Sequence, residues 1–323
     1  MANAAAVAVA AQFCIGLPYH GANRAASLSR INREHSRLEF RSKRRRIIAS
    51  ASGAQNRTDG GLSLPEIHRK GRGTKRVFFL DVNPICYNGN TRSLRSFADW
   101  ISLFFSEVSH RDPVIAAIDG ENCSQYRRQL LPSYKTHRRK FSAQFPASQR
   151  LSRSPVGRIL EKCNVPVLKI DGHEADDVVA TLAGQVLQTD YRVVIASPDK
   201  DFKQLISENV QIVLPMPEFN QWHFYTIKHY RAQYNCDPCC DLSLRSMMGD
   251  EVDGVPGIQH VAPGFGRKTA LKLLKKHGSL ENLLSAAAVR TVGKPYVQDT
   301  LTKYADYLRR NYEVLALKSG VVV

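Results

Sequence analysis

The sequence has no apolar run that approaches the length of a membrane span, so we expect neither a membrane-embedded protein nor a membrane partner. Acidic residues are the scarcer charge: 46 Lys and Arg stand against 29 Asp and Glu, a net charge of +17. This excess suits a polyanionic partner, either nucleic acid or an anionic membrane surface, and of the two we expect nucleic acid. The first 50 residues hold nine basic and two acidic side chains, and the rest of the chain still carries about +10.

The seven cysteines form no even, spaced framework, so reduced thiols are the expectation. Cys236, Cys239 and Cys240 resemble half of a zinc site, and two histidines lie nearby in the sequence. A second ligand pair at metal-site spacing is missing, which argues against zinc.

Residues 1–50 are rich in Ala, Ser and Arg and end in a basic run, Arg44 to Arg46. This composition predicts an organellar transit peptide, and the alternative is a disordered basic tail. The Ala-rich start and the Ser content favour a chloroplast, whereas the Arg density favours a mitochondrion, and together they allow import into both. Residues 51–75, rich in Gly, Ser and Arg, are typical of a linker.

Folded sequence begins at Arg76 with short apolar runs that are typical of buried parallel strands. These runs lie at residues 77–80, 113–118, 165–170 and 192–196, and three of them are closely followed by Asp81, Asp119 and Asp199. Helical patterns lie between them, at residues 94–108, 154–163 and 175–188. The alternation predicts a parallel α/β sheet with its ligand site beyond the carboxyl ends of the strands. We expect a strand or a hairpin through Val213 and residues 222–225, and helices from Ile227 onward.

Acidic residues recur where these predicted strands end or the next helix begins. The candidate metal ligands are Asp81, Asp119, Glu174, Asp176, Asp177, Asp199, Asp201, Asp250 and Asp253. Carboxylates this dense repel one another unless cations neutralise them, and their oxygens suit Mg²⁺ or Mn²⁺. Two such ions, about 4 Å apart, activate water and stabilise the leaving oxygen in phosphodiester cleavage. Asp177 is also a candidate for a helix cap.

Two further segments indicate contact with a nucleic acid. Between Tyr126 and Arg153, basic and aromatic residues are interleaved, which suits a strand held by its phosphates and stacked by its bases; the alternative is a solvated charged face. The turn through Gly264 and Gly266 enters a helix with Lys268 and Thr269 in its first turn. Backbone N–H groups at such a helix start bind DNA phosphates, although glycines also serve as plain turn formers.

These motifs, in this order, resemble the 5′–3′ exonuclease domain of bacterial DNA polymerase I and, more distantly, flap endonucleases. The resemblance covers about residues 76–290. It is carried by Leu80-Asp81, Ile118-Asp119, Tyr134-Lys135-Thr136-His137-Arg138, Asp171-Gly172-His173-Glu174-Ala175-Asp176-Asp177, Ser197-Pro198-Asp199-Lys200-Asp201, Met248-Gly249-Asp250-Glu251-Val252-Asp253 and Lys268-Thr269-Ala270. The transit-like leader suggests a plant-type organellar member, and no polymerase region follows.

The resemblance implies a PIN-like parallel-sheet nuclease core at residues 76–225, with a helical arch at residues 126–153. It also implies a helical region at residues 226–323 with a helix-hairpin-helix variant that binds duplex DNA and often K⁺. One Mg²⁺ would be held by Asp81, Asp119, Glu174 and Asp176, and a second by Asp176, Asp199, Asp201 and Asp253, with Asp177 and Asp250 in support. Arg127 and Lys135 would steer the scissile phosphate, Tyr126 would stack on a terminal base, and Arg138 would contact DNA.

The chain departs from the family pattern at two places. Four extra residues, Gln259 to Ala262, precede Pro263, which puts the duplex grip and K⁺ binding in doubt. Arg128 stands where the bacterial pattern commonly has an acid.

The leading hypothesis is a monomeric, structure-specific 5′–3′ exonuclease or flap endonuclease that acts on 5′ ends, flaps, duplex junctions or RNA primers in organellar DNA replication or repair. Water would be the nucleophile, with metal in place of a protein base. The alternatives are an RNA-processing nuclease on the same fold and a catalytically silent nucleic-acid-binding protein.

Overall fold

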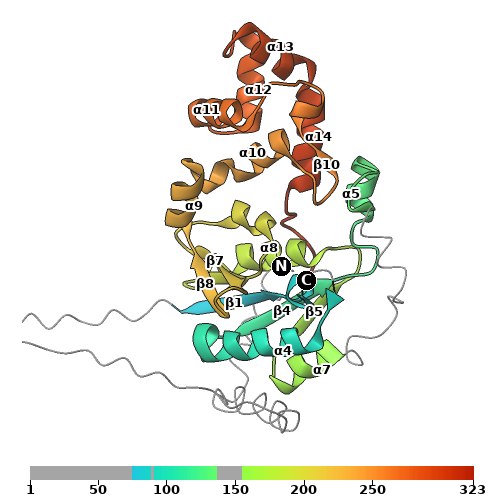
Figure 1. Cartoon of the computed structure of the whole chain (residues 1–323), viewed down its shortest axis with the longest axis vertical. Helices are drawn as coiled ribbons and strands as arrows, with labels where there is room; N and C mark the ends of the chain where they lie inside the picture. Colours follow the sequence, from blue (N-terminus) through green and yellow to red (C-terminus); the bar gives the residue numbers. More distant parts are fainter. Residues whose placement is uncertain (1–74, 89–90, 137–154) are drawn as a thin grey trace, which may run out of the picture.

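The computed structural model describes residues 75–88, 91–136 and 155–323 (Figure 1). The predicted transit peptide, almost all of the predicted linker, and the greater part of the predicted arch, including Arg138, lie outside the described residues. Within the described ranges, no helix combines the length and the apolar character needed to cross a membrane.

A six-stranded sheet lies at the centre of the core, in the order β5-β4-β1-β6-β7-β8. Its strands are β1 (Arg76–Asp81), β4 (Val114–Asp119), β5 (Val167–Ile170), β6 (Arg192–Ala196), β7 (Val210–Met216) and β8 (Gln221–Tyr225). Neighbouring strands from β5 to β7 pair in parallel, and β8 pairs antiparallel with β7. The predicted parallel α/β sheet is confirmed, and the segment predicted as a strand or a hairpin forms a hairpin.

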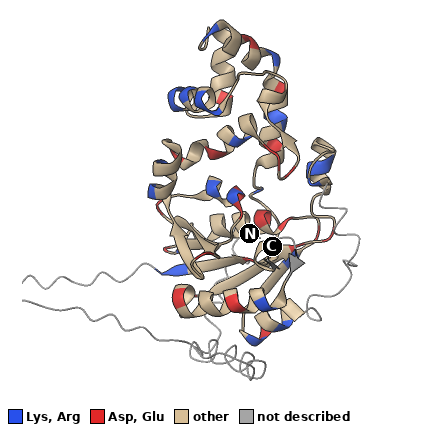
Figure 2. Ribbon diagram, viewed as in Figure 1, with Lys and Arg blue, Asp and Glu red and all other residues tan. Residues whose placement is uncertain are grey.

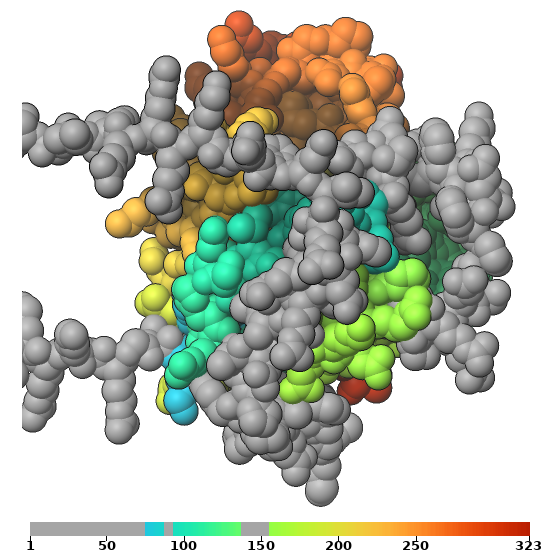
Figure 3. Space-filling view, turned by 60° about the horizontal axis from the view of Figure 1, so that its bottom comes forward, coloured from blue at the N-terminus to red at the C-terminus, as the bar shows by residue number. Residues whose placement is uncertain are grey.

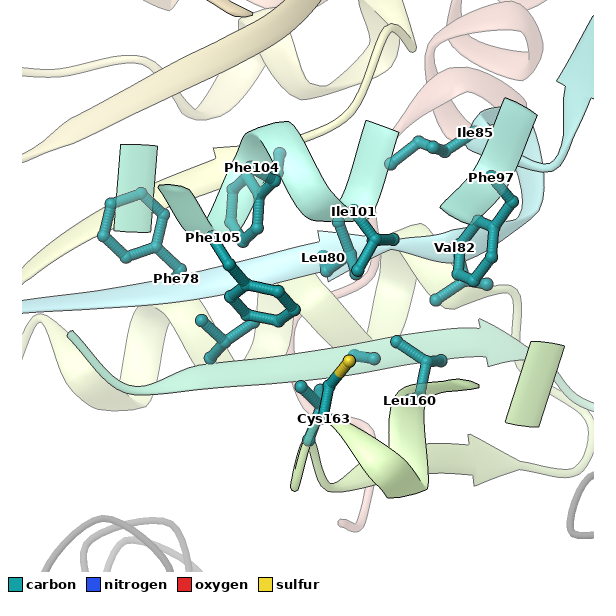
Figure 4. Close-up of a cluster of buried hydrophobic side chains, with 14 of the residues drawn as sticks. Phe78, Leu80, Val82, Ile85, Phe97, Ile101, Phe104, Phe105, Leu160 and Cys163 are labelled. Carbon is teal, nitrogen blue, oxygen red and sulfur yellow. The ribbon is translucent and has the colours of Figure 1, made fainter. Parts of the chain in front are cut away.

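One face of the sheet is covered by α4 (Leu94–Leu103), the π-helical turn η1 (Phe104–Ser109) and α7 (Pro155–Lys162). In the space-filling view, α4 and α7 lie side by side on this face (Figure 3). Between helices and sheet, large side chains fill a continuous apolar cluster (Figure 4). The rings of Phe78 and Phe104 meet edge to face there, with centroids 5.6 Å apart. Burial on both faces explains why β1 is an unbroken apolar run.

The opposite face is covered by α8 (Ala175–Val186) and α9 (Ile227–Tyr234). Val178, Val179 and Leu182 of α8 are buried against Val77 and Phe79 of β1. Because α8 begins at Ala175, with Glu174 as its N-cap, its first turn is held at the carboxyl edge of the sheet. The predicted acid-opened helix is therefore present.

Short elements connect the layers and surround the carboxyl edge of the sheet. They are α3 (Val82–Ile85), β2 (Tyr87–Asn88), β3 (Thr91–Arg92), α5 (Gln125–Leu130), η3 (Lys200–Leu205), η4 (Pro238–Cys240), β9 (Gly249–Asp250), β10 (Val255–Pro256) and η5 (Ile258–His260).

A helical region lies beyond this edge and has an apolar core of its own, which includes Met247, Phe265 and Leu274 (Figure 1). Its helices are α10 (Asp241–Met248), α11 (Arg267–His277), α12 (Leu280–Val289), α13 (Pro295–Lys303) and α14 (Ala305–Leu315). After α14 the chain returns to the core, where Val321 is buried in the cluster under α8. This C-terminal segment, residues 316–323, thus joins the helical region to the six-stranded sheet.

Candidate active site

Strand ends and one helix start bring four carboxylates together, which we call the sheet-edge group: Asp81, Asp119, Glu174 and Asp176. Asp81 ends β1 and accepts a 2.7 Å hydrogen bond from the Ser197 hydroxyl. Asp119 ends β4 and accepts a 2.9 Å hydrogen bond from the backbone N–H of Ala175, which ties β4 to the start of α8. The parallel sheet therefore converts distant sequence positions into one local concentration of acid.

Burial raises the pKa values of three acids in this group, Asp81, Asp119 and Asp176. The pKa of Asp81 rises to about 8, mainly because burial disfavours its charged form, and the nearby Asp199 and Asp119 add to the rise. The pKa of Asp176 is raised well above its usual value by burial and then by the charge of Glu174. In the metal-free protein, the positive charge around these carboxyls is too small to offset the cost of burying their charged forms.

Glu174 is the compensated member of the group. Its oxygens accept hydrogen bonds from Ser124 Oγ at 2.6 Å, Tyr134 Oη at 3.1 Å and Lys135 Nζ at 2.7 Å. Burial alone would raise the pKa of Glu174, but the charges of Lys135 and Arg127, with these hydrogen bonds, lower it to about 2. Glu174 is thus held as a carboxylate.

Lys135 lies between the acids. Burial acts to raise the pKa of five surrounding carboxyls, and the charge of Lys135 acts in the opposite direction on all five: Asp81, Asp119, Glu174, Asp176 and Asp201. Its backbone N–H donates to Asp253 O at 2.8 Å. A Cβ on Gly254 would lie 2.5 Å from Ser133 O, so glycine permits this close approach of the two segments. The predicted steering residue is therefore placed at the site.

Three further acids form the loop group: Asp201 on η3, Asp250 on β9, and Asp253. One carboxylate oxygen of each lies within 4.8 Å of the other two. This group has counterions, because one amino group of Arg245 donates to Asp201 at 2.6 Å and to Asp250 at 2.9 Å. Lys200 Nζ donates to Asp250 at 2.7 Å.

The counterions act unequally within the loop group. Burial raises the pKa of Asp201 to about 7 although Arg245 opposes the shift. Burial would also raise the pKa of Asp250, but the hydrogen bonds from Lys200 and Arg245 outweigh it and lower that pKa. Asp250 is the neutralised member of this group.

Asp199 connects the two groups. Its carboxylate caps η3 by accepting from the backbone N–H of Asp201 at 2.9 Å. Its own N–H donates to Ser197 Oγ at 3.0 Å, and the same hydroxyl donates to Asp81. Eight of the nine predicted carboxylates thus lie in or between the two groups.

The ninth, Asp177, pairs with Arg127, which also lies 3.3 Å from Glu174 of the sheet-edge group. The Arg127 guanidinium donates to both Asp177 oxygens, at 2.8 and 2.6 Å, and to the backbone carbonyls of Val314 and Ala316, each at 3.0 Å. Its side chain is only 3% exposed. This buried contact differs from the role that the resemblance implied for Arg127, which was to steer the scissile phosphate. The N–H donors of Arg127 already have acceptors within the protein.

Tyr126 lies near the surface on α5. Its hydroxyl donates to Glu313, and Lys318 Nζ lies 3.0 Å from the centroid of its ring. One face of the predicted stacking residue is therefore in contact with a cation. Arg138, the other predicted DNA contact of the arch, lies outside the described residues.

The glycine turn leads into α11 as the sequence indicated. Gly264 has φ +95°, a conformation that favours glycine, and Gly266 is the N-cap. Lys268 is exposed and Thr269 half-buried in the first turn. Figure 2 shows Lys and Arg at repeated positions along α11. Between the helical region and the sheet, the ribbon carries Asp and Glu as well as basic positions.

The four extra residues before Pro263 belong to a packed turn. The helical turn η5 covers Ile258–His260, and both Ile258 and Ala262 are buried in the core of the helical region. The Tyr296 hydroxyl lies 2.9 Å from Ala262 O and 2.6 Å from Pro263 O. The insertion therefore extends the apolar core at the entrance to α11.

Several side chains that complete the site had no role predicted from the sequence, among them Ser124, Tyr134, Ser197, Lys200 and Arg245. Arg245 follows no recognisable pattern, and its only sequence signal is its position five residues before Asp250. Ser197 opens the Ser-Pro-Asp motif but had no predicted role. The available signal was the position of Ser197, two residues before the predicted ligand Asp199.

Comparisons with known proteins agree with this geometry. Residues 75–235 match the family described as "5′-3′ exonuclease, N-terminal resolvase-like domain", and residues 239–323 match "5′-3′ exonuclease, C-terminal SAM fold". A 5′-3′ exonuclease of Aquifex aeolicus is 37% identical over 186 residues, 57% of this chain and 60% of that protein. DNA polymerase I of Bacillus caldotenax is 26% identical over 255 residues, 77% of this chain and 27% of the polymerase.

The chain thus spans 60% or less of the length of these two relatives. Among solved structures, the T5 D15 protein co-crystallised with metal ions has a TM-score of 0.60 at 21% identity, over 75% of this chain and 90% of that one. A T5 D15 flap endonuclease pseudo-enzyme–product complex with DNA and metal ions has a TM-score of 0.56 at 20% identity, over 75% and 89%. These likenesses show the fold.

Proposed function

This chain belongs to the 5′–3′ exonuclease family, and on that premise we propose that it is a metal-dependent nuclease that hydrolyses DNA phosphodiester bonds at 5′ ends and flaps. The observation that carries the proposal is the convergence of the sheet-edge group and the loop group around Lys135. An excess of carboxylate beside one ammonium suits a site that takes up divalent cations and a phosphate together.

The donor set fits hard divalent cations. Four cations, Arg127, Lys135, Lys200 and Arg245, form ion pairs with Glu174, Asp177, Asp201 and Asp250. Set against all nine predicted carboxylates, these four charges leave a formal charge of −5 if every acid ionises. The raised pKa values of Asp81 and Asp176 are the local sign of this imbalance. Two Mg²⁺ ions, or Mn²⁺ in their place, would offset four of the five charges, and their ligands would come from both groups. When bound, such ions lower the pKa of water and stabilise charge on phosphate oxygens.

The protein's own side chains would hold and orient the reactants. Glu174 fixes the Lys135 ammonium, which is free to contribute further N–H donors to a phosphate oxygen. Burial alone would lower the pKa of Lys135, but the charge of Glu174 raises it well above its usual value, so the ammonium stays charged. Ser197 fixes the orientation of Asp81, and Arg127 anchors α5 to α8.

Duplex DNA would be held by the start of α11. Its first backbone N–H groups, with Arg267 and Lys268, offer a phosphate site that reads no sequence. The T5 D15 flap endonuclease, which has a similar fold, was solved in a complex with DNA and metal ions.

A cleavage assay on the full chain tests the proposal. A 5′-labelled flap, a nicked duplex and matched RNA strands are incubated with Mg²⁺ or with EDTA. We expect Mg²⁺-dependent cleavage of the DNA substrates, with the flap and the nick cut fastest. Faster cleavage of RNA would favour the RNA-processing alternative, and no cleavage of any substrate would refute the nuclease.

Two matched variants distinguish the loss of a metal ligand from the loss of an acidic charge elsewhere on the protein. Asp199→Asn should abolish cleavage and largely spare DNA binding in EDTA. Asp99→Asn is the control, because Asp99 is an exposed acid on α4. Equal activity of the two variants would contradict the ligand role of Asp199.

We also propose that residues 1–50 direct the protein to plastids, with mitochondria as the second destination. The support is the Ala-, Ser- and Arg-rich composition of this leader. Residues 1–75 fused to a fluorescent protein in plant cells should enter plastids, mitochondria or both. A fusion that stays in the cytosol would contradict the proposal.

A further inference from the structure

The C-terminal segment brings a lysine to the arch side of the candidate site. The backbone of Lys318 is fixed on both sides: its N–H donates to Asp177 Oδ1 at 2.8 Å, and its carbonyl accepts from Thr181 Oγ1 at 3.2 Å. The same hydroxyl accepts from the N–H groups of Gly320 and Val321. Lys318 is thus anchored to the first two turns of α8, the helix that begins with the acids.

The ammonium of Lys318 lies over Tyr126, and no carboxylate holds it. Its Nζ is 3.0 Å from the ring centroid, whereas Lys135 and Lys200 each contact a carboxylate at 2.7 Å. Among the ion pairs of the described residues, none includes Lys318. Asp177 already accepts from Arg127 and from the Lys318 backbone, and Glu313 accepts from the Tyr126 hydroxyl. The charge of Lys318 is therefore available to an anion.

The position of Arg127 strengthens the case. Its guanidinium donors are taken by Asp177 and by two backbone carbonyls, so this residue does not present a cation to a passing strand. Lys318 is the cation that faces the surface of Tyr126. A charge-assisted hydrogen bond to a phosphate is stronger than a cation–π contact at a partly exposed site, so a phosphate would draw the ammonium from the ring.

We propose that Lys318 binds a phosphate of the DNA strand whose base stacks on Tyr126, so that ammonium and base exchange places on the ring. The proposal rests on the proposed function, because it assumes that a DNA strand enters beside α5. The phosphate has two possible sources: the 5′-terminal phosphate, or a phosphodiester within the strand. Glu313 would hold the Tyr126 hydroxyl and with it the plane of the ring.

Binding and cleavage by the full chain test the proposal separately. Affinity is measured in EDTA for flap substrates that carry a 5′-phosphate or a 5′-hydroxyl, and kcat and KM are measured in Mg²⁺. Lys318→Gln should weaken binding about five- to tenfold and lower the salt dependence by about one phosphate contact, with kcat within about twofold. Lys318→Arg should restore affinity. A loss confined to the 5′-phosphate substrate identifies the terminal phosphate, and an equal loss on both identifies an internal one.

Lys75→Gln is the matched control. Lys75 Nζ also lies over a tyrosine, 5.5 Å from the Tyr191 centroid, but at the amino end of β1, opposite the acids. Its replacement should leave binding unchanged. Wild-type affinity of Lys318→Gln for both substrates would overturn the proposal. If wild-type protein binds but cleaves nothing, the nuclease function fails while the binding comparison still decides the role of Lys318.

Discussion

The two carboxylate groups differ in how their acids are compensated: Arg245 contacts two of the three acids of the loop group, whereas in the sheet-edge group only Glu174 has a lowered pKa. In the loop group, Arg245 and Lys200 already neutralise Asp250, and its pKa is lowered. In the sheet-edge group, Asp81 and Asp176 are buried with raised pKa values. A carboxylate that has its counterion stabilises the free protein, whereas one that lacks a counterion stabilises only the protein with cations bound. The comparison therefore separates the part of the site that is already neutralised from the part that requires ions.

The largest effect is expected from Asp176→Asn, which removes a charge from the sheet-edge group at almost unchanged volume. Cleavage should fall by about three orders of magnitude, because a cation that stabilises the transition state loses a ligand. The stability of the metal-free protein should not decrease, because burial and the charge of Glu174 already disfavour the charged form of Asp176 there. Single-turnover cleavage and thermal unfolding in EDTA measure the two quantities. A full cleavage rate would remove Asp176 from the ion-requiring group.

Asp250→Asn should produce the opposite result in the metal-free protein. It leaves Arg245, whose side chain is 12% exposed, without one of its acids. We expect a loss of about 2 kcal/mol in the free energy of unfolding, less than for a fully buried pair because Lys200 is half exposed. Urea unfolding in EDTA measures it. If Asp250→Asn is as stable as wild type while Asp176→Asn is destabilised, the roles of the two groups are exchanged.

A third expected effect is a pH dependence of stability to which Asp81 of the sheet-edge group contributes; Asp201 of the loop group, whose pKa burial raises to about 7, adds to it with the same sign. The folded-state pKa of Asp81 is about 8, above the ordinary value in an unfolded chain, so the folded protein binds more protons between about pH 4 and 8. The stability of the metal-free protein should therefore decrease as pH rises through this window. The lowered pKa of Asp250 acts with the opposite sign and below this window. Thermal unfolding in EDTA at pH 5.5 and 8.5 measures the difference.

The same window predicts proton release when ions bind. Near pH 7 a divalent cation should displace the proton of Asp81 when it binds. Calorimetric titrations in buffers of different ionisation enthalpy give the number of protons released. Asp81→Asn should reduce the count and flatten the dependence of stability on pH. An unchanged count in this variant would place the proton elsewhere.

The smallest effect is expected from Tyr134→Phe, which removes one of three hydrogen bonds to Glu174. The free energy of unfolding should fall by about 1 kcal/mol, and cleavage should slow a few-fold. Tyr230→Phe is the control, since its hydroxyl donates to Asp241, outside both carboxylate groups, at 2.9 Å. Both variants should lose similar stability, but only Tyr134→Phe should lose activity. Equal activity would show that Glu174 needs no help from Tyr134.

The sheet-edge group was the part of the site that the sequence predicted most directly. An apolar run followed by Asp identifies both a buried parallel strand and the edge at which it ends, so the sequence alone places Asp81 and Asp119 together. Glu174 and Asp176 followed from their position at a helix start beside that edge. Local pattern sufficed because the parallel topology brings every such end to one side.

The counterions could not be predicted in the same way. Arg127 stands in a basic stretch that resembled an exposed arch, yet its partners lie 50 positions away at Asp177 and 187 positions away at Val314. Arg245 is a single basic residue in a helix and gives no periodic signal. Contacts of this kind depend on how the C-terminal segment and α10 pack against the core, which no local pattern encodes.

Lys135 has a left-handed backbone, with φ 50°. For a residue other than glycine or asparagine, this conformation costs on the order of 1 kcal/mol. Selection for thermal stability alone would therefore favour glycine or asparagine at position 135. Selection for cleavage would disfavour both residues, because neither carries the ammonium group of lysine. At position 135, selection for a more stable fold and selection for enzymatic activity therefore favour different residues.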